Sequence, residues 1–258
     1  MIDFSGISND SVLGRVLRLP LALIPRRAVL PVIAGPLKGV RWRVGALTHG
    51  CWLGSYERDK QLSIAAELRP AMTTYDIGAN AGFYTLLMAR GVGPSGKVYA
   101  FEPFPENVTN LLCHLSWNGM RNAQVIEAAV SNATGMTGFA AGPGNSMGHL
   151  SAGETTLRVP TISLDDAVAR LGVAEPDLVK MDVEGAEGAV LAGASRILAA
   201  HRATWFVALH GAEQQRVCQE RFEAAGYELF TLRGQRITTA LAGSEVDEIV
   251  ARPKPGAA

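Results

Sequence analysis

Short apolar runs alternate with helical stretches along the chain from residue 73 onward. This pattern is typical of a parallel sheet whose strands are joined by crossover helices. We therefore expect an α/β fold with a doubly wound, mostly parallel sheet. The runs that predict strands are 73–77, 97–101, 124–130, 178–183 and 204–209, and the stretches that predict helices are 82–90, 105–117 and 186–200.

The end of the chain has a different pattern. After Gly226, the segments 227–232, 236–239 and 245–250 are separated by short turns. Short turns join antiparallel neighbours, whereas parallel strands need a longer crossover. We expect these segments to finish the sheet as antiparallel strands.

Residues 135–153 are rich in glycine and interrupt the alternation of strands and helices. A long loop inside a domain is often a binding loop or a lid. We expect this segment to contact the substrate through Asn145 and His149, and His149 is also a second candidate for a catalytic base.

The first 70 residues lack the alternation, and four prolines interrupt them between positions 20 and 36. Within this region, residues 39–45 alternate in the manner of a strand, with Val40, Trp42 and Val44 on one face. We interpret residues 1–70 as an N-terminal extension or cap and residues 71–258 as the main domain.

The composition excludes two classes of protein. With 48% apolar and only 19% charged residues, the chain is not a disordered one. Its 24 basic residues are matched by 24 acidic residues, so no cationic surplus favours a nucleic acid as the partner.

The three cysteines, Cys51, Cys113 and Cys218, are far apart and form no C-x-x-C pair. Their spacing predicts neither a zinc site nor a disulfide framework. The chain also shows neither a secretory signal nor the run of about 18 or more apolar residues that spans a membrane. We expect a cytoplasmic protein without an integral membrane segment, and nothing in the pattern indicates an oligomeric state.

The most informative motif begins where the first predicted strand ends. Asp76 closes the strand, and Gly78 and Gly82 enclose Asn80 in a G-x-N-x-G pattern before a helix begins. Glycines at such a turn let a ligand approach the backbone. The second strand ends in Glu102, 20 residues after Gly82, where an acid can reach ribose hydroxyls.

Together these residues favour S-adenosylmethionine, with its ribose on Glu102 and its cationic part near Asp76, Gly78 and Asn80. An acid before the first glycine suits a cationic ligand better than a diphosphate. Structural alternatives are that Asp76 and Asn80 cap the helix and that Glu102 is a solvated strand end. A nicotinamide-dependent oxidoreductase or a noncatalytic nucleotide-binding module would share the fold, but this turn lacks the third glycine of the oxidoreductases.

A second dense motif, D-V-E-G-A-E, lies at the end of the predicted strand 178–183. Ligands of open α/β sheets bind outside the carboxyl ends of the strands, so we expect Asp182 and Glu184 to take part in catalysis. In the alternative interpretation, Glu184 and Glu187 complement the amino terminus of the following helix. Lys180 shares a strand face with Asp182 and is a candidate partner for it.

His210 follows the next predicted strand, again at a carboxyl end. An imidazole with an ordinary pKa of about 6.5 can accept the proton of an attacking hydroxyl, so His210 is our first candidate for the catalytic base. A hydrogen-bonded structural histidine is the alternative. Asp182, Glu184 and His210 would also allow a divalent metal, Mg²⁺ or Mn²⁺, although we favour a site without metal.

Five segments resemble, in order and spacing, the FkbM family of S-adenosylmethionine-dependent methyltransferases. The similarity covers about residues 50–232, and the D-V-E-G-x-E motif is its most distinctive part. The sequence GSYE at 54–57 is also similar to a G-x-Y-E segment of that family. The five segments are DIGANAGFYTLLMA, VYAFEPFPENVTNLL, AAVSNATG, TISLDD and VKMDVEGAEGAVLAGA.

The resemblance implies a Rossmann-like fold and methylation of hydroxyl groups on sugars, polysaccharides or polyketide-type natural products. It also implies that Glu57 approaches the cofactor or the acceptor. Family members often carry an acid two residues before the histidine, in an E-x-H pattern, where this chain has Ala208 before His210. Glu213 is our candidate for the missing acid.

These observations predict an O-methyltransferase that acts on a small-molecule or glycan hydroxyl. The acceptor oxygen would attack the methyl carbon of the sulfonium in line, giving a methyl ether and S-adenosylhomocysteine. Because the methyl group is already activated, we expect the enzyme to act mainly by alignment.

Overall fold

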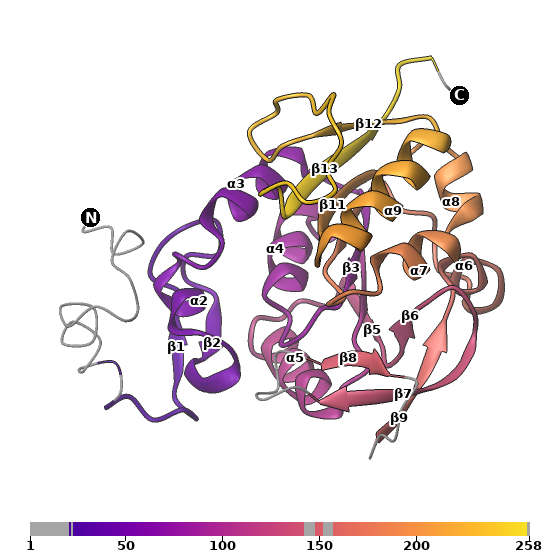
Figure 1. The fold of residues 1–258 in the computed structure, drawn as a ribbon. Coiled ribbons are helices and arrows are strands. Elements are labelled where there is room, and N and C mark those ends of the chain that lie inside the picture. The colour runs from indigo at the N-terminus through magenta and orange to yellow at the C-terminus, as the bar shows by residue number, and fades with distance from the viewer. Residues whose placement is uncertain (1–20, 22, 142–147, 152–156, 257–258) are drawn as a thin grey trace.

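The central feature of the computed structural model is a seven-stranded sheet (Figure 1). The structure describes residues 21, 23–141, 148–151 and 157–256, with the backbone alone for 139–141 and 148–151. In spatial order the strands are β12 (Tyr227–Phe230), β13 (Glu248–Pro253), β11 (Thr204–Ala208), β10 (Leu178–Met181), β3 (Thr73–Ile77), β4 (Lys97–Phe101) and β5 (Ala123–Ile126).

The strands from β11 to β5 run parallel, and β13 lies antiparallel between β11 and β12. The predicted doubly wound, mostly parallel sheet with antiparallel C-terminal strands is therefore confirmed. From β3 the chain winds outward first through β4 and β5 and later through β10 and β11. Ligands of such sheets bind where the winding direction reverses, so the carboxyl ends of β3 and β10 mark the expected site.

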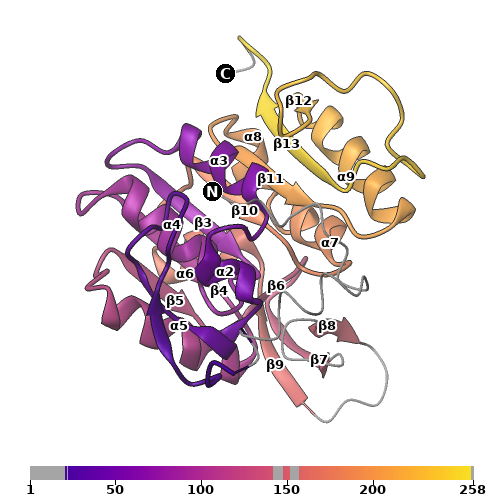
Figure 2. The same ribbon diagram turned by 90° about the vertical axis from the view of Figure 1, so that its left-hand side faces the viewer.

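Helices cover both faces of the sheet (Figure 2). Side chains alternate along each strand, so Tyr75 and Ile77 of β3 enter one core, whereas Val98 and Ala100 of β4 enter the other. The first core lies under α6 (Leu164–Leu171), α7 (Glu187–Ala192), α8 (Ser195–Ala199) and α9 (Ala212–Ala224), and the second under α4 (Phe83–Val92) and α5 (Pro105–Trp117).

The N-terminal region packs on the second core. Its elements are β1 (Val29–Pro31), β2 (Arg41–Arg43), the 3₁₀ turn η1 (Val44–Ala46), α2 (His49–Leu53) and α3 (Arg58–Glu67). Val40, Trp42 and Val44 are buried, as the alternation predicted. The Trp42 ring stacks on His114 of α5 with the ring centroids 4.0 Å apart. A domain boundary at residue 70 stays a prediction.

A second, four-stranded sheet was not expected. It has the order β6 (Ala129–Val130), β9 (Leu157–Ile162), β7 (Gly135–Ala141) and β8 (Gly148–Ser151). The prediction of one strand over 124–130 was wrong, because a bond from the Ala128 amide to the Ile126 carbonyl turns the chain between β5 and β6. The prediction of a loop over 135–153 was wrong in part, because β7 and β8 pair antiparallel there.

Two further predictions need correction. The helix expected over 186–200 is two helices, because the backbone leaves helical geometry at Gly193, with ψ of 9°, and at Ala194, with φ of −123° and ψ of 24°. The strand expected over 236–239 is a single bridge from Phe230 to Arg236 after a turn at Gly234.

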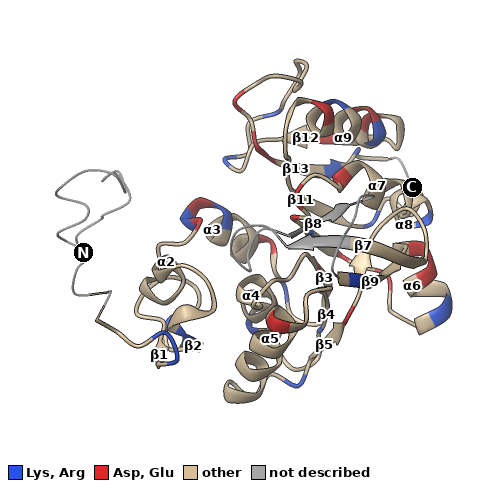
Figure 3. Cartoon of the chain, turned by 60° about the horizontal axis from the view of Figure 1, so that its bottom comes forward, with Lys and Arg blue, Asp and Glu red and all other residues tan. Residues whose placement is uncertain are grey.

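Acidic and basic residues are interspersed along α3 and α9 (Figure 3). Among the helices that the structure describes, none is long and apolar enough to cross a membrane.

Candidate functional site

The carboxyl ends of β3 and β10 meet at the point where the winding reverses. The Asp182 amide donates to the Ile77 carbonyl at 3.1 Å. Gly78 has a φ of +72°, and a Cβ on it would lie 1.9 Å from the Asp182 carbonyl oxygen. A Cβ on Gly82 would lie 2.2 Å from Leu111 Cδ1. In the glycine turn, residues 78–82, Gly78 is therefore required by packing against the backbone, whereas at Gly82 the positive φ of +90° favours glycine and the Leu111 side chain could move.

Asp76 lies in the interior behind the glycine turn and is 0% exposed. The registers of β3 and β10 place Asp76 opposite Lys180. Lys180 Nζ lies 3.3 Å from Asp76 Oδ1 and donates to the Gly78 carbonyl at 3.0 Å. Thr85 Oγ1 donates to the other carboxylate oxygen at 2.6 Å. Lys180 thus pairs with Asp76 directly across the sheet.

Glu102 lies at the end of β4 beside the glycine turn and is 5% exposed. Its carboxylate accepts bonds from the Asn80 amide at 2.7 Å, the Phe104 amide at 2.9 Å and Asn107 Nδ2 at 3.2 Å. Burial raises the pKa of Glu102, and these donors oppose that shift. A carboxylate offers about four acceptor positions, so roughly one is left for a ligand.

Lys60 of α3 lies among three carboxylates at the same end of the sheet. Its Nζ lies 3.0 Å from Glu57 and 3.8 Å from Asp182, and it also pairs with Glu248 of β13. Lys60 is 2% exposed. Burial acts to lower its pKa, but the three carboxylates raise the pKa above the ordinary value, so Lys60 stays charged.

Tyr84 connects the two buried lysines. Lys60 Nζ and Lys180 Nζ lie 5.6 Å and 5.5 Å from the centroid of its ring. Its hydroxyl donates to Glu57 Oε2 at 2.7 Å. Burial, followed by the charge of Glu57, raises the pKa of Tyr84, so this hydroxyl remains a donor.

A cavity of about 430 Å³ opens beside Lys60. It lies between the N-terminal region and the C-terminal strands, and all of its lining residues except one are polar or charged. They are Ser55, Glu57, Arg58, Asp59, Lys60, Leu232 and Glu248.

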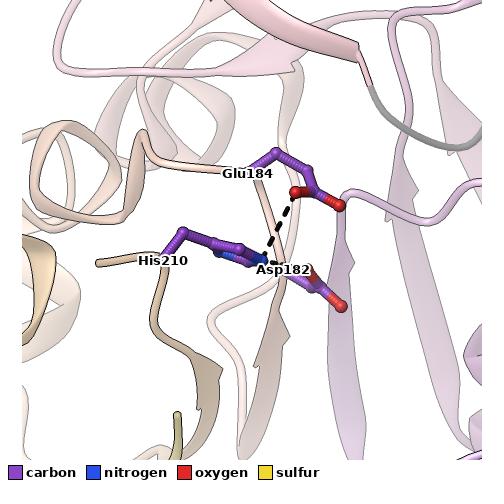
Figure 4. Close-up of side chains that lie close together, drawn as sticks. All are labelled: Asp182, Glu184 and His210. Atoms are coloured by element: carbon purple, nitrogen blue, oxygen red, sulfur yellow. Dashed lines mark ion pairs between the residues drawn. The ribbon is translucent and has the colours of Figure 1, made fainter. Parts of the chain in front are cut away.

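Asp182, Glu184 and His210 form what we call the reactive edge (Figure 4). His210 Nε2 lies 3.4 Å from Glu184 Oε2 and 3.7 Å from Asp182 Oδ1. His210 Nδ1 lies 2.7 Å from Glu187 Oε1. A Cβ on Gly185 would meet no atom of the described residues within 4 Å, so that part of the chain does not pack against this glycine.

The electrostatics of the reactive edge follow from these contacts. The hydrogen bond with Glu187 raises the pKa of His210, burial opposes this, and the charges of Glu187, Asp182 and Glu184 raise it further. Burial acts to raise the pKa of Asp182, but Lys180, Lys60 and His210 together lower it below the ordinary value. Asp182 is therefore ionised beside the imidazole.

The structure brings together most of the residues that the sequence singled out. Asp182, Glu184 and His210 lie within contact distance, and Glu57 joins them through Lys60. Asn145 lies outside the described residues, and His149 lies in β8, opposite Ala140 of β7. The roles proposed for all of these residues stay predictions.

Glu213 does not supply the missing acid. Its side chain is 68% exposed and pairs with Arg216 at 2.7 Å. The acid that bonds to Nδ1 of His210 is Glu187, which enters from α7.

Sequence reasoning missed Lys60 and Glu248. Lys60 follows Glu57 by three residues, a spacing at which two side chains meet on one helix face. No local signal identifies Glu248, because only the pairing of β13 with β11 brings it to this end of the sheet.

The residues present fit S-adenosylmethionine in their chemistry. Glu102 stands beside the glycine turn, at the strand end from which acids reach ribose hydroxyls. Glu57, Asp182 and Glu184 make the open side acidic, which suits a sulfonium cation.

Comparisons with known proteins also indicate a methyltransferase. Residues 76–237, more than half of the chain, match the Methyltransferase FkbM domain. Hexuronic acid methyltransferase AglP of Haloferax volcanii is 30% identical over 125 residues, which cover 48% of this chain and 50% of that protein. A protein-L-isoaspartate O-methyltransferase of Methanothrix thermoacetophila is 27% identical over 106 residues, which cover 41% of this chain and 50% of that protein.

This chain thus spans about half the length of both relatives. A crystal structure of methyltransferase FkbM from Methylobacillus flagellatus KT is similar over 72% of this chain and 45% of that chain, with 19% identity and a TM-score of 0.46. From the match over residues 76–237, the chain belongs to the FkbM family of S-adenosylmethionine-dependent methyltransferases.

Proposed function

We propose that this protein transfers a methyl group from S-adenosylmethionine to a hydroxyl group of a sugar, a glycan or a polyketide-type natural product. The observation that carries the proposal is the orientation of His210. Its Nδ1 contacts a buried carboxylate, and its Nε2 faces Asp182 and Glu184 at the reactive edge, where the His210 side chain is 33% exposed. An imidazole in this position can accept the proton of an acceptor hydroxyl.

The proposed cofactor site lies on the side of the glycine turn. Glu102 would accept from the ribose hydroxyls, and Glu57 and the turn would contact the amino acid portion. The proposed cofactor contacts are Glu57, Gly78, Asn80, Gly82 and Glu102. Asp76, which is 0% exposed and bonded to Lys180 and Thr85, would act on the cofactor only by holding the turn.

S-adenosylmethionine supplies an activated methyl group, and the chain supplies alignment and proton transfer. Holding the acceptor oxygen in line with the methyl carbon can contribute roughly 7–11 kcal/mol to lowering the barrier. His210 Nε2 would take the hydroxyl proton, which typically contributes about 10²- to 10⁴-fold in rate. Asp182 and Glu184 flank Nε2 and would hold the acceptor by further hydrogen bonds.

The charges of the site favour an uncharged acceptor group. Asp182 is ionised and Glu184 lies beside it, so a carboxylate acceptor would be repelled at the reactive edge. The charged side chains that line the cavity beside Lys60 could bond to the hydroxyl groups of a sugar, and their carbon atoms could pack against its ring. The relative from Haloferax volcanii is named for a sugar acid, whose ring hydroxyls belong to the proposed acceptor class although its carboxylate does not.

The proposal is tested by incubating the protein with methyl-labelled S-adenosylmethionine and two panels of acceptors, neutral and uronic-acid oligosaccharides and polyketide lactones. We expect label in a methyl ether, together with S-adenosylhomocysteine. His210→Gln should reduce turnover by about 10²- to 10⁴-fold, while the exposed Glu213→Gln serves as the matched control and should retain it. Label in an ester or an amine, or cofactor binding without turnover on either panel, would overturn the proposal.

A further inference from the structure

Glu187 is the residue that holds His210. Glu187 is 0% exposed, and its Oε1 lies 2.7 Å from His210 Nδ1. The same oxygen accepts from the Gly185 amide at 3.0 Å. An ionised carboxylate only accepts hydrogen bonds, so Nδ1 carries a proton. In the neutral imidazole, which is the form that acts as a base, the lone pair is therefore on Nε2.

The charge of Glu187 has a single counterion among the described residues. Its second oxygen, Oε2, is buried and accepts no hydrogen bond within the part of the chain that the structure describes. The only ion pair formed there by Glu187 is with His210. A buried carboxylate without a permanent cation favours protonation of the imidazole beside it.

We propose that Glu187 is a positioning residue that fixes the Nδ1–H tautomer of His210 and stabilises the imidazolium formed during methyl transfer. This inference rests on the proposed function. In the step concerned, the hydroxyl proton passes to His210 Nε2 while the acceptor oxygen bonds to the methyl carbon and the carbon–sulfur bond breaks. The sulfonium becomes a neutral thioether, and the positive charge moves to an imidazole that already faces Glu187.

The groups around His210 are consistent with this division of roles. Asp182 and Glu184 face Nε2, and Lys60 lies behind Asp182 at 3.8 Å. Cys218 of α9 is close enough to Glu187 to interact with its charge. Burial raises the pKa of Cys218 to about 12, so the side chain remains a neutral thiol. Glu187 is thus the carboxylate that acts on Nδ1.

Glu187 also supports the turn that presents Glu184. Glu184 has a φ of +53° and Gly185 a φ of +100°, both in the left-handed region, and the Gly185 amide is tied to Glu187. Loss of Glu187 could therefore act through this turn instead of through the imidazole. The experiment must separate these two effects.

The first test is the tautomer of His210 in the free protein, measured by long-range ¹H–¹⁵N correlation NMR. The chain has five histidines, so a His210→Gln spectrum assigns the signal. Wild type and Glu187→Gln should both show the Nδ1–H form, because a glutamine oxygen still accepts. Glu187→Met, which removes the acceptor, should shift His210 toward the Nε2–H form.

The second test is kinetic. Glu187→Gln, which keeps the acceptor but removes the charge, should lower kcat by about tenfold, and Glu187→Met by about a hundredfold, with little change in KM. In a His210→Gln background, Glu187→Gln should cost less than a further threefold, because the two residues act as a unit.

The outcomes separate this inference from the proposed function. A folded Glu187→Met protein with wild-type tautomer and kcat would overturn the inference, as would an undiminished loss in the His210→Gln background. Absence of methyl transfer by the wild type would overturn the proposed function instead, while the tautomer measurement would still report on Glu187.

Discussion

The glycine turn and the reactive edge lie side by side at the carboxyl ends of β3 and β10, yet their polar groups are arranged in opposite ways. At the turn, Asp76 and Glu102 are buried and bonded to other parts of the chain. At the edge, the side chains of His210 and Glu184 are 33% and 38% exposed. The difference shows that the turn is a preformed scaffold, whereas the polar side chains that solvent or a ligand can reach lie at the edge.

We expect the largest loss of stability from a substitution at Lys180, which lies behind the glycine turn. Lys180→Met leaves the buried Asp76 without its cation, and loss of one partner of a buried pair typically costs about 3–5 kcal/mol. Urea unfolding measures the loss. Lys97→Met, on the neighbouring β4 but exposed, is the control and should change stability by less than about 0.5 kcal/mol. If the two variants were equally stable, the pairing of Lys180 with Asp76 would have no structural role.

A second substitution tests whether the turn also binds the cofactor. Glu102→Ala should weaken S-adenosylmethionine binding by about tenfold to a hundredfold, because hydrogen bonds to a charged group contribute about 1.5–3 kcal/mol. Isothermal titration calorimetry measures the affinity, and the exposed Glu106→Ala in the first turn of α5 is the matched control. Wild-type affinity in the Glu102 variant would show that this carboxylate only holds the turn.

Two glycine substitutions compare the packed and the open side directly. Gly78 and Gly185 both have positive φ, but only at Gly78 would a Cβ meet an atom of the protein. Gly78→Ala should therefore cost about 2–4 kcal/mol, and Gly185→Ala about 1–2 kcal/mol from backbone strain alone. The comparison requires only unfolding curves, and equal losses would contradict the open environment of Gly185.

The smallest effect concerns pH. The folded state raises the pKa of His210 above its value in the unfolded chain, chiefly through Glu187. The stability that His210 contributes is thus fully present below about pH 6.5 and is lost as the pH rises through the folded pKa. The stability difference between wild type and His210→Gln should be larger near about pH 5.5 than near about pH 9. A difference that grew with pH would mean that folding lowers the pKa of His210.

The parts of the fold that the sequence predicted well are those with strong local patterns. β3 and β4 are short buried strands, and α5 begins at a proline and is amphipathic, so all three have the predicted bounds. The split of 124–130 was not predictable in this way, because a single turn at Ala128 redirects the chain while the residues on both sides keep strand propensity.

In the candidate site, too, the sequence predicted only the residues that a local pattern identifies. Asp182 and His210 were predictable because each follows a parallel strand, and parallel strands end at one edge. The partnership of Glu187 with His210 joins residues 23 positions apart through the packing of α7 against α9, the helix that follows His210, and no spacing rule predicts it. Lys60 and Glu248 are further apart still, and they meet only because α3 packs against the C-terminal strand.

The contact of Lys60 with Glu57, Asp182 and Glu248 has a consequence for protein engineering. An attempt to alter acceptor choice by grafting the N-terminal region of another family member would remove the ammonium that Asp182 and Glu248 share. A graft would succeed only if the donor segment brought a lysine at the equivalent place in α3 or if Glu248 were replaced at the same time. Recombination boundaries in this protein are therefore set by charge balance as much as by sequence position.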